Sequence, residues 1–146
     1  MVRASTSFLV VLVTAFLLTS CGTSFNKPWH AAVAKPVPTN SIEGPWLGFW
    51  KSAASGHSGA LRCIVGPAQG GSREFYYHAT WGGVFRAGFQ TLHEVKETAG
   101  TTAFTAKRSI ERHGFFQAEC KITPTESNAT YRAAGDHGVF ELRRPK

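Results

Sequence analysis

Short apolar runs separated by glycine-rich turns fill residues 42–144 and constrain the fold more than any other feature of the sequence. No window has the 3.6-residue apolar period of an amphipathic helix, whereas residues 103–107 and 116–122 alternate between apolar and polar side chains, as half-buried strands do. The pattern predicts strands at residues 46–52, 59–65, 73–81, 84–95, 101–110, 115–122, 129–133 and 139–143. We therefore expect an all-β domain, a single eight-stranded antiparallel meander that forms a barrel.

One hairpin of this domain is specific enough for its register to be predicted. Glycine accepts the positive φ angles of a two-residue turn, so residues 82–83 are expected to join two strands. Trp81 would then pair with Val84, and Tyr76 with Phe89. Both faces of this hairpin carry aromatic residues, and we expect its outside to be covered by the preceding segment, a partner or lipid. Scattered exposed aromatic residues are the alternative.

The N-terminus has the pattern of an export signal. Arg3 provides a positive lead, and the apolar residues 8–18 are too few to cross the hydrocarbon core, which takes roughly 20 residues. The sequence Leu18-Thr19-Ser20-Cys21-Gly22 follows, and it resembles the lipobox of bacterial lipoproteins. This resemblance implies cleavage after residues 1–20 and a lipid on Cys21 that holds the chain to a membrane of the cell envelope, on its extracytoplasmic side. An ordinary signal peptide with a chance cysteine is the alternative.

The remaining chain divides into two parts. Residues 21–41 contain Pro28, Pro36 and Pro38 and lack useful periodicity, which predicts a flexible tether after the lipidated cysteine. Residues 42–146 are expected to form the β-barrel domain, since about 100 residues are enough for one domain. Gly22 stands where some bacterial lipoproteins carry an inner-membrane retention aspartate, so an outer membrane is the preferred destination.

The chain is basic, with a formal net charge of +7 that becomes +6 when Arg3 is removed with the signal peptide. Its lysines and arginines are scattered from Lys27 to Lys146, and export separates it from nucleic acid. We expect no nucleic acid partner. Anionic lipid head groups or envelope polymers are the neighbours that this charge favours.

Both ends of the domain carry a second resemblance. Residues 44–50 read Gly-Pro-Trp-Leu-Gly-Phe-Trp, and the chain closes with Phe-Glu-Leu-Arg-Arg at residues 140–144. This resembles the lipocalins and related calycin barrels, and it implies that Trp46 packs beneath Arg143 or Arg144 and closes one end of the barrel. The segments 56–63 and 136–145 also resemble a group of uncharacterised small bacterial envelope proteins, which implies no activity.

Two further cysteines, Cys63 and Cys120, lie on the apolar faces of their predicted strands. In an oxidising envelope such a pair predicts a disulfide. The second and sixth strands of a round barrel are too far apart for the bridge, which prefers a Cα separation of about 4.4–6.8 Å, so the disulfide predicts a flattened barrel. Two buried free thiols in a round barrel are the alternative.

Groups that could carry chemistry are sparse. Asp136 is the only aspartate, and the glutamates are spread singly, so a paired-carboxylate site has little material. Residues 56–60, around Ser58, faintly resemble a hydrolase nucleophile turn, but a hairpin loop explains them equally. No two of the six histidines have metal-ligand spacing, and His137 belongs to a turn. We expect no catalytic residues, no metal and no cofactor.

These observations predict a membrane-anchored, non-enzymatic β-barrel that binds a small amphiphile in its mouth or an envelope protein on its wall. The aromatic hairpin provides the expected contact residues, which are Tyr76, Tyr77, Trp81, Arg86 and Phe89. A structural envelope protein whose barrel is filled by its own side chains is the alternative. An envelope hydrolase that uses Ser58 or His137 is the least supported interpretation.

Overall fold

The computed structural model describes the backbone of residues 20–98, 101–110 and 114–146, and the side chains of residues 25–96 and 117–146. A helix, α2 (Ser20–Val33), precedes the strands β1 (Gly44–Ser52), β2 (Ser58–Gln69), β3 (Ser72–Trp81), β4 (Phe85–Thr98), β5 (Thr101–Ile110), β6 (Gly114–Ile122), β7 (Glu126–Ala133) and β8 (Asp136–Arg143). The predicted all-β, antiparallel class is confirmed. The signal peptide lies outside the described residues except for Ser20, as do the side chains of Cys21 and of the alternating segment 103–107.

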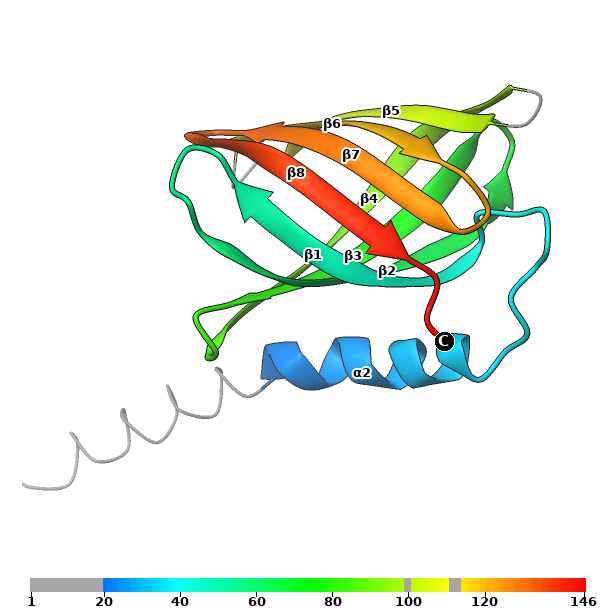
Figure 1. Cartoon of the computed structure of the whole chain (residues 1–146), viewed down its shortest axis with the longest axis horizontal. Helices are drawn as coiled ribbons and strands as arrows, with labels where there is room; N and C mark the ends of the chain where they lie inside the picture. Colours follow the sequence, from blue (N-terminus) through cyan, green and yellow to red (C-terminus); the bar gives the residue numbers. More distant parts are fainter. Residues whose placement is uncertain (1–19, 99–100, 111–113) are drawn as a thin grey trace, which may run out of the picture.

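Each strand pairs antiparallel with the next one in the chain, and β1 also pairs with β8, so the sheet closes into a barrel (Figure 1). The closing ladder runs from Leu47 opposite Arg143 to Ser52 opposite Gly138. Glycine is required here because a Cβ on Gly138 would lie 1.9 Å from the carbonyl oxygen of Lys51. A larger residue at this position would force the first and last strands apart.

The interior of the barrel is built from alternate side chains of the strands. The predicted alternation in residues 116–122 is confirmed where side chains are described, since Ala118, Cys120 and Ile122 are buried while Glu119 and Lys121 are exposed. Among the described side chains, the core consists of Ile42, Trp46, Leu61, Cys63, Val65, Phe75, Tyr77, Ala118, Cys120, Ile122, Tyr131, Phe140 and Leu142. These side chains come from both halves of the sheet and meet inside it.

One end of the barrel, which we call the closed end, is capped by Trp46 and Arg144. The indole of Trp46 is completely buried, and its Nε1 donates a hydrogen bond to the carbonyl of Ile42 at 2.8 Å. The Arg144 guanidinium carbon lies 4.0 Å from the centroid of this ring, within range for a cation–π contact. Arg143, the other arginine considered for this position, is exposed. Burial lowers the pKa of Arg144 to about 10.

The β3–β4 hairpin differs from its predicted register by one residue. The turn contains three residues, 82–84, and Trp81 pairs with Phe85 rather than with Val84. Tyr77 therefore pairs with Phe89, and Tyr76 with Gln90. Gly82 and Gly83 have the expected positive φ, but the turn also includes Val84, whose side chain is 74% exposed. Because side chains alternate along a strand, this single residue moves every side chain of β4 to the opposite face.

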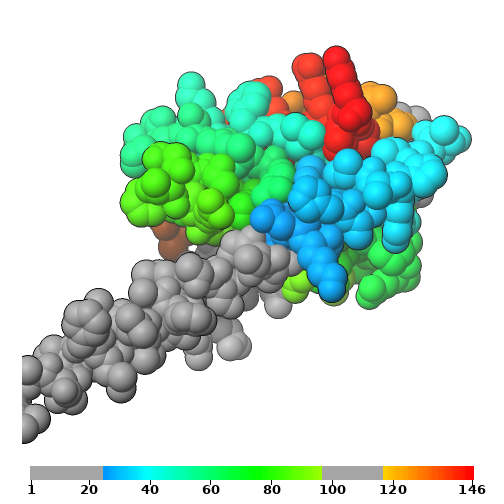
Figure 2. Space-filling model, turned by 90° about the horizontal axis from the view of Figure 1, so that it is seen from below, coloured from blue at the N-terminus to red at the C-terminus, as the bar shows by residue number. Residues whose placement is uncertain are grey.

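The segment expected to be a flexible tether is in part a helix. α2 runs along the outside of the barrel (Figures 1 and 2), and its Phe25 and Trp29 are buried. Phe25 lies against Tyr76, with ring centroids 4.7 Å apart, so the helix covers the outer aromatic face of the hairpin. This helix is difficult to predict from the sequence because its apolar stripe is short, with Phe25 and Trp29 spaced i, i+4. No helix in the described part of the chain is long and apolar enough to cross a membrane.

The predicted disulfide is absent from the structure, in which Cys63 and Cys120 are free buried thiols. They belong to β2 and β6, strands on different parts of the wall, and both line the same narrow gap of about 10 Å³ in the core. The hydroxyl of Ser127 lies 3.0 Å from the sulfur of Cys120. The disulfide argument for a flattened barrel therefore no longer applies.

Candidate binding site at the barrel mouth

The barrel end opposite Trp46 is open, and we call it the mouth. It lies at the turns that join β1 to β2, β3 to β4 and β7 to β8, on the left in Figure 1. A cavity of about 470 Å³ enters the barrel there, within the range of roughly 300–1,000 Å³ typical of small-molecule sites. Its lining is mostly aromatic and aliphatic, and consists of Trp50, Leu61, Ala79, Trp81, Ala87, Gly88, Phe89, Tyr131, Ala133, Asp136 and Phe140.

Aromatic rings make the rim of this cavity. Trp50 and Trp81 meet edge to face with ring centroids 6.1 Å apart, and Trp81 stacks on Phe85 at 5.7 Å. The Nε1 of Trp50 donates a hydrogen bond to the carbonyl of Thr80 at 3.1 Å, which fixes the indole across the β1–β3 side of the mouth. The rim is therefore both apolar and held in a defined orientation.

Among the described residues that line the mouth, Asp136 is the one that carries a carboxylate. It accepts hydrogen bonds from the hydroxyl of Ser52 at 2.5 Å, from the hydroxyl of Tyr131 at 3.0 Å and from the backbone N–H of His137 at 2.8 Å. Burial, followed by the hydrogen bond and charge of Asp136, raises the pKa of Tyr131 to about 12. Tyr131 thus remains a neutral donor at neutral pH, and the described lining of the mouth places the oriented carboxylate of Asp136 beside an apolar cavity.

The mouth cavity ends on packed aromatic residues. Tyr77 and Phe140 lie with ring centroids 5.8 Å apart, and Phe140 stacks on Tyr131 at 4.7 Å. Beyond them the interior narrows to the small gap beside the cysteines, and Phe140 lines both spaces. The barrel is consequently filled towards its closed end and hollow towards its mouth.

The structure divides the five predicted contact residues between two surfaces. Trp81 and Phe89 line the mouth cavity, and Tyr77 stacks on Phe89 inside the barrel with ring centroids 5.0 Å apart. Tyr76 lies outside, under Phe25 of α2, and Arg86 lines a separate hollow on the outer wall. The predicted register put Tyr76 on one face with Phe89, and Arg86 on the other face with Tyr77 and Trp81. The one-residue shift exchanges Arg86 and Phe89 between these two faces.

The mouth residues that come from strands outside the β3–β4 hairpin were not predicted from the sequence. Trp50, Tyr131, Asp136 and Phe140 come from β1, β7 and β8 and reach the cavity only because the sheet closes. Two signals were available. Asp136 is the sole aspartate, and Trp50 follows Trp46 at a spacing that puts both indoles on one side of a strand.

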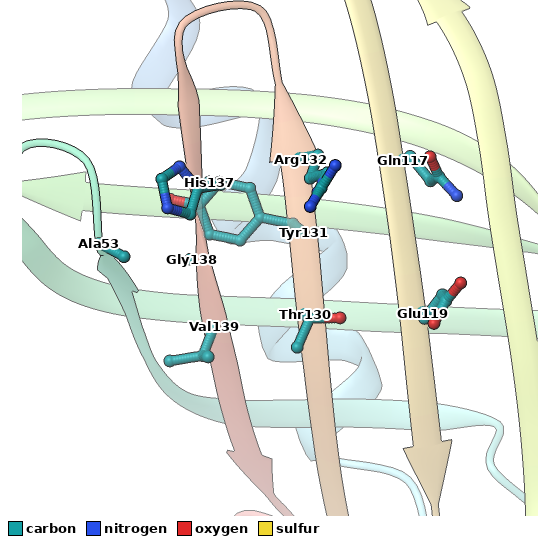
Figure 3. A pocket seen from close by; sticks show the side chains of 9 residues that line it. All are labelled: Ala53, Gln117, Glu119, Thr130, Tyr131, Arg132, His137, Gly138 and Val139. Atoms are coloured by element: carbon teal, nitrogen blue, oxygen red, sulfur yellow. The ribbon is translucent and has the colours of Figure 1, made fainter.

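A second hollow, of about 610 Å³, lies on the outer surface of β6, β7 and β8 and is shown in Figure 3. Cross-strand neighbours form its base, with Gln117 beside Arg132 and Glu119 beside Thr130. Exposed polar side chains surround it, and it has no enclosed apolar wall. It is larger than the mouth cavity, but its lining is mainly polar whereas that of the mouth is mainly aromatic and aliphatic, so we regard the mouth as the better candidate site.

The residues considered for hydrolase chemistry do not come together. Ser58 is exposed at the start of β2, opposite Lys51, and within the described side chains its hydroxyl has no hydrogen bond to a histidine. His137 lies on the outer hollow and donates its backbone N–H to Asp136. No group of three potential metal ligands occurs among the residues that the structure describes.

No protein-family model matches this chain, and no curated protein matches it. The mouth is therefore interpreted from its own geometry.

Proposed function

We propose that this chain is a membrane-anchored lipoprotein whose β-barrel binds a small amphiphile in its mouth without catalysing a reaction. The observation that carries the proposal is the 470 Å³ cavity, because an aromatic wall with one fixed polar group suits a molecule with an apolar part and a polar head. The tail would lie against Trp81 and Phe89. The head would lie near Asp136, a position that favours hydroxyl, amine or ammonium groups over anions.

The proposal includes a relationship to the lipocalins and other calycin barrels. Support comes from Arg144, which lies over the buried indole of Trp46 in the first strand, as the resemblance implies. Further support comes from the division of the interior into a filled closed end and a hollow mouth, an arrangement that suits ligand binding at one end of a small barrel.

The proposal also includes export and anchoring. The lipobox residues 18–21 support cleavage before Cys21 and lipid attachment there, with the barrel on the extracytoplasmic side of the envelope and the outer membrane as the preferred location. Two or more acyl chains give durable membrane residence, whereas one gives only marginal binding. Metabolic labelling with a fatty acid tests this, since Cys21→Ser should lose both the label and the cleavage. A labelled, normally cleaved Cys21→Ser protein would contradict it.

Ligand binding is tested by filling the mouth. Ala87 lines the cavity, and Ala87→Phe should weaken the binding of a fluorescent long-chain fatty alcohol to the unlipidated mature chain by about tenfold or more. Ala60→Phe is the matched control, because Ala60 is exposed on the outside of β2 opposite Phe49. Equal affinities in the two variants would exclude the mouth as the binding site.

A structural envelope protein without a ligand is the second candidate. The packing of Tyr77, Phe140 and the cysteines below the mouth favours it, because this part of the barrel is already filled by its own side chains. Native mass spectrometry of the protein isolated from its host separates the two functions. A bound small molecule that is lost in Ala87→Phe supports the binding protein, and an envelope protein retained in both variants supports the structural or partner-binding role.

A further inference from the structure

A hollow of about 330 Å³ on the outer wall, beside the first turns of α2, is lined by two arginines and a histidine. Arg62, Arg86 and His78 line it together with Asn26 of the helix. The Nη2 of Arg62 donates a hydrogen bond to Oδ1 of Asn26 at 3.1 Å and lies 3.3 Å from Nδ1 of His78. These contacts hold the Arg62 guanidinium at the hollow beneath the helix.

The positive charge of this hollow has no compensating carboxylate among its described lining residues. Burial, and then the charge of Arg86, lowers the pKa of Arg62, which indicates that the two guanidinium groups repel each other. Burial and the same two arginines lower the pKa of His78. Like charges gathered without an acidic residue favour an anion supplied from outside the chain.

The hairpin turn beside the hollow is apolar and exposed. Val84 is 74% exposed and Phe85 is 57% exposed, the two most exposed large hydrophobic residues among the described side chains. Phe85 lines the hollow and also stacks on Trp81 at the rim of the mouth. An apolar tip next to two arginines has the composition of a surface that enters the boundary between lipid head groups and acyl chains.

The position of Cys21 in the helix indicates which end of the protein would lie next to the membrane. Cys21 is the second residue of α2, and Asn26 at the hollow lies five positions further along the chain. At a helical rise of 1.5 Å per residue, the two lie about 7.5 Å apart along the helix axis. The start of α2 and the β3–β4 turn lie at the same end of the molecule, which is also the end of the mouth (Figure 1). A lipid on Cys21 would bring this end to the bilayer.

We propose that the β3–β4 turn and the hollow between Arg62 and Arg86 dock on an anionic bilayer, with Val84 and Phe85 in the interface and a lipid phosphate between the arginines. The inference rests on the proposed anchor at Cys21 and deepens the proposed function, because docking turns the mouth towards the membrane from which an amphiphile would enter. A lipid phosphate suits the site better than a soluble one, since only a bilayer also covers the apolar tip.

The test uses the full lipidated chain inserted in vesicles of phosphatidylcholine alone or mixed with phosphatidylglycerol. Hydrogen exchange at residues 82–87 is measured, together with flotation of the protein with the vesicles. We expect slower exchange in the mixed vesicles. Arg86→Gln should reduce this protection by about fivefold, the effect of one basic residue near an anionic surface. Arg143→Gln is the matched control, because Arg143 is exposed on β8 towards the closed end.

A second variant tests the apolar contact without changing charge. Val84→Ser should reduce protection in the mixed vesicles and leave the melting temperature unchanged, because Val84 lies in the turn and is largely exposed. Protection that is equal in the two kinds of vesicle, or equal in Arg86→Gln and Arg143→Gln, would overturn the docking proposal. Equal protection by inorganic phosphate in detergent would overturn it in favour of a soluble anion.

Failure of the anchor gives a different result. A chain that does not float with vesicles of pure phosphatidylcholine lacks the lipid attachment and contradicts the proposed function. A chain that floats with neutral vesicles but shows no charge-dependent protection keeps its anchor and contradicts only the docking.

Discussion

Arg144 stacks on the buried ring of Trp46 while it donates hydrogen bonds to the backbone carbonyls of Ser41, Glu43 and Pro45 at 2.6, 2.8 and 3.2 Å. The guanidinium therefore fastens the segment before β1 to the end of β8. Gly44 leaves the space for it, because a Cβ there would lie 3.3 Å from Nη1.

Replacing Arg144 by lysine should destabilise the protein although the charge is kept. Lysine presents a compact ammonium group and cannot reproduce the planar stack and the forked hydrogen bonds. We expect Arg144→Lys to lower the free energy of unfolding by about 1–3 kcal/mol, measured by urea denaturation. Arg143→Lys, at an exposed position, should change it by less than about 0.5 kcal/mol. Similar values for the two variants would contradict the role of Arg144.

Trp46→Ala should destabilise the barrel by about 3–5 kcal/mol, the usual cost of truncating a buried aromatic residue. The indole is completely buried and its Nε1–H is bonded to Ile42, so both packing and a hydrogen bond are lost. Thermal unfolding followed by circular dichroism measures the effect. A melting temperature within a degree or two of the wild type would show that the closed end does not depend on this residue.

Gly138→Ala should be destabilising because the new Cβ would collide with the backbone of Lys51 on the neighbouring strand. Overpacking of this kind costs about 1–3 kcal/mol, and the closing ladder between β1 and β8 is the part that must move. Gly71→Ala is the control, since nothing lies within 4 Å of its Cβ position and its φ is not positive. Denaturant unfolding should separate the two variants, and equal stability would argue against the tight β1–β8 approach.

The stability of the protein should fall as the pH drops from 7 to 4. His93 is completely buried beside Thr91, and burial lowers its pKa from 6.5 to about 4. Between these pH values the unfolded chain binds a proton at His93 that the folded chain does not bind, so acid favours unfolding. The contribution is about 3 kcal/mol. His93→Gln should have a shallower dependence of unfolding free energy on pH, and an unchanged slope would show that His93 is not responsible.

Thiol reactivity should distinguish the native and unfolded states. Burial, and then the neighbouring Cys120, raises the pKa of Cys63 well above its usual value, and burial raises the pKa of Cys120 to about 12. The thiolate is the form of cysteine that attacks an aromatic disulfide reagent and displaces its aromatic thiolate, so both residues should react very slowly in the native Cys21→Ser protein. Two thiols should be titrated in unreduced, denatured protein. None would indicate that the disulfide predicted from the sequence forms after all.

The sequence was informative about elements and weak about how they combine. Alternation in residues 116–122 and the glycine turns predicted strands correctly, because local side-chain period reports which face is buried. The register of the β3–β4 hairpin depended on whether Val84 belonged to the turn, which no local pattern decides. The predicted site depends on the same question. With Val84 counted in the turn, Arg86 lies on the outer face of β4 and Phe89 on the inner face, the reverse of the predicted placement relative to β3.

Elements whose stability comes from distant contacts were not predictable. α2 contains Pro28, which is unfavourable inside a helix, and it is held by Phe25 and Trp29 against the barrel and by Arg62, whose guanidinium carbon lies 5.0 Å from the centroid of the Phe25 ring. The mouth likewise needs β1, β7 and β8 to meet β3 and β4. In the sequence, the aromatic residues of the mouth cannot be distinguished from ordinary core residues. Only the closed sheet shows that a cavity remains between them.

The position of Phe140 has a consequence for how such a barrel can change. Its ring lines both the mouth cavity and the gap beside the cysteines, so under the proposed function it would limit the length of the ligand that the cavity accepts. A smaller residue at position 140 would join the mouth cavity to the gap beside the cysteines. The cavity would become deeper, while the turns, the charges and the aromatic rim would stay the same. Under the proposed function, the residue that limits ligand length is therefore a different one from Asp136 near the proposed head-group position, and a substitution at either could change one property without the other.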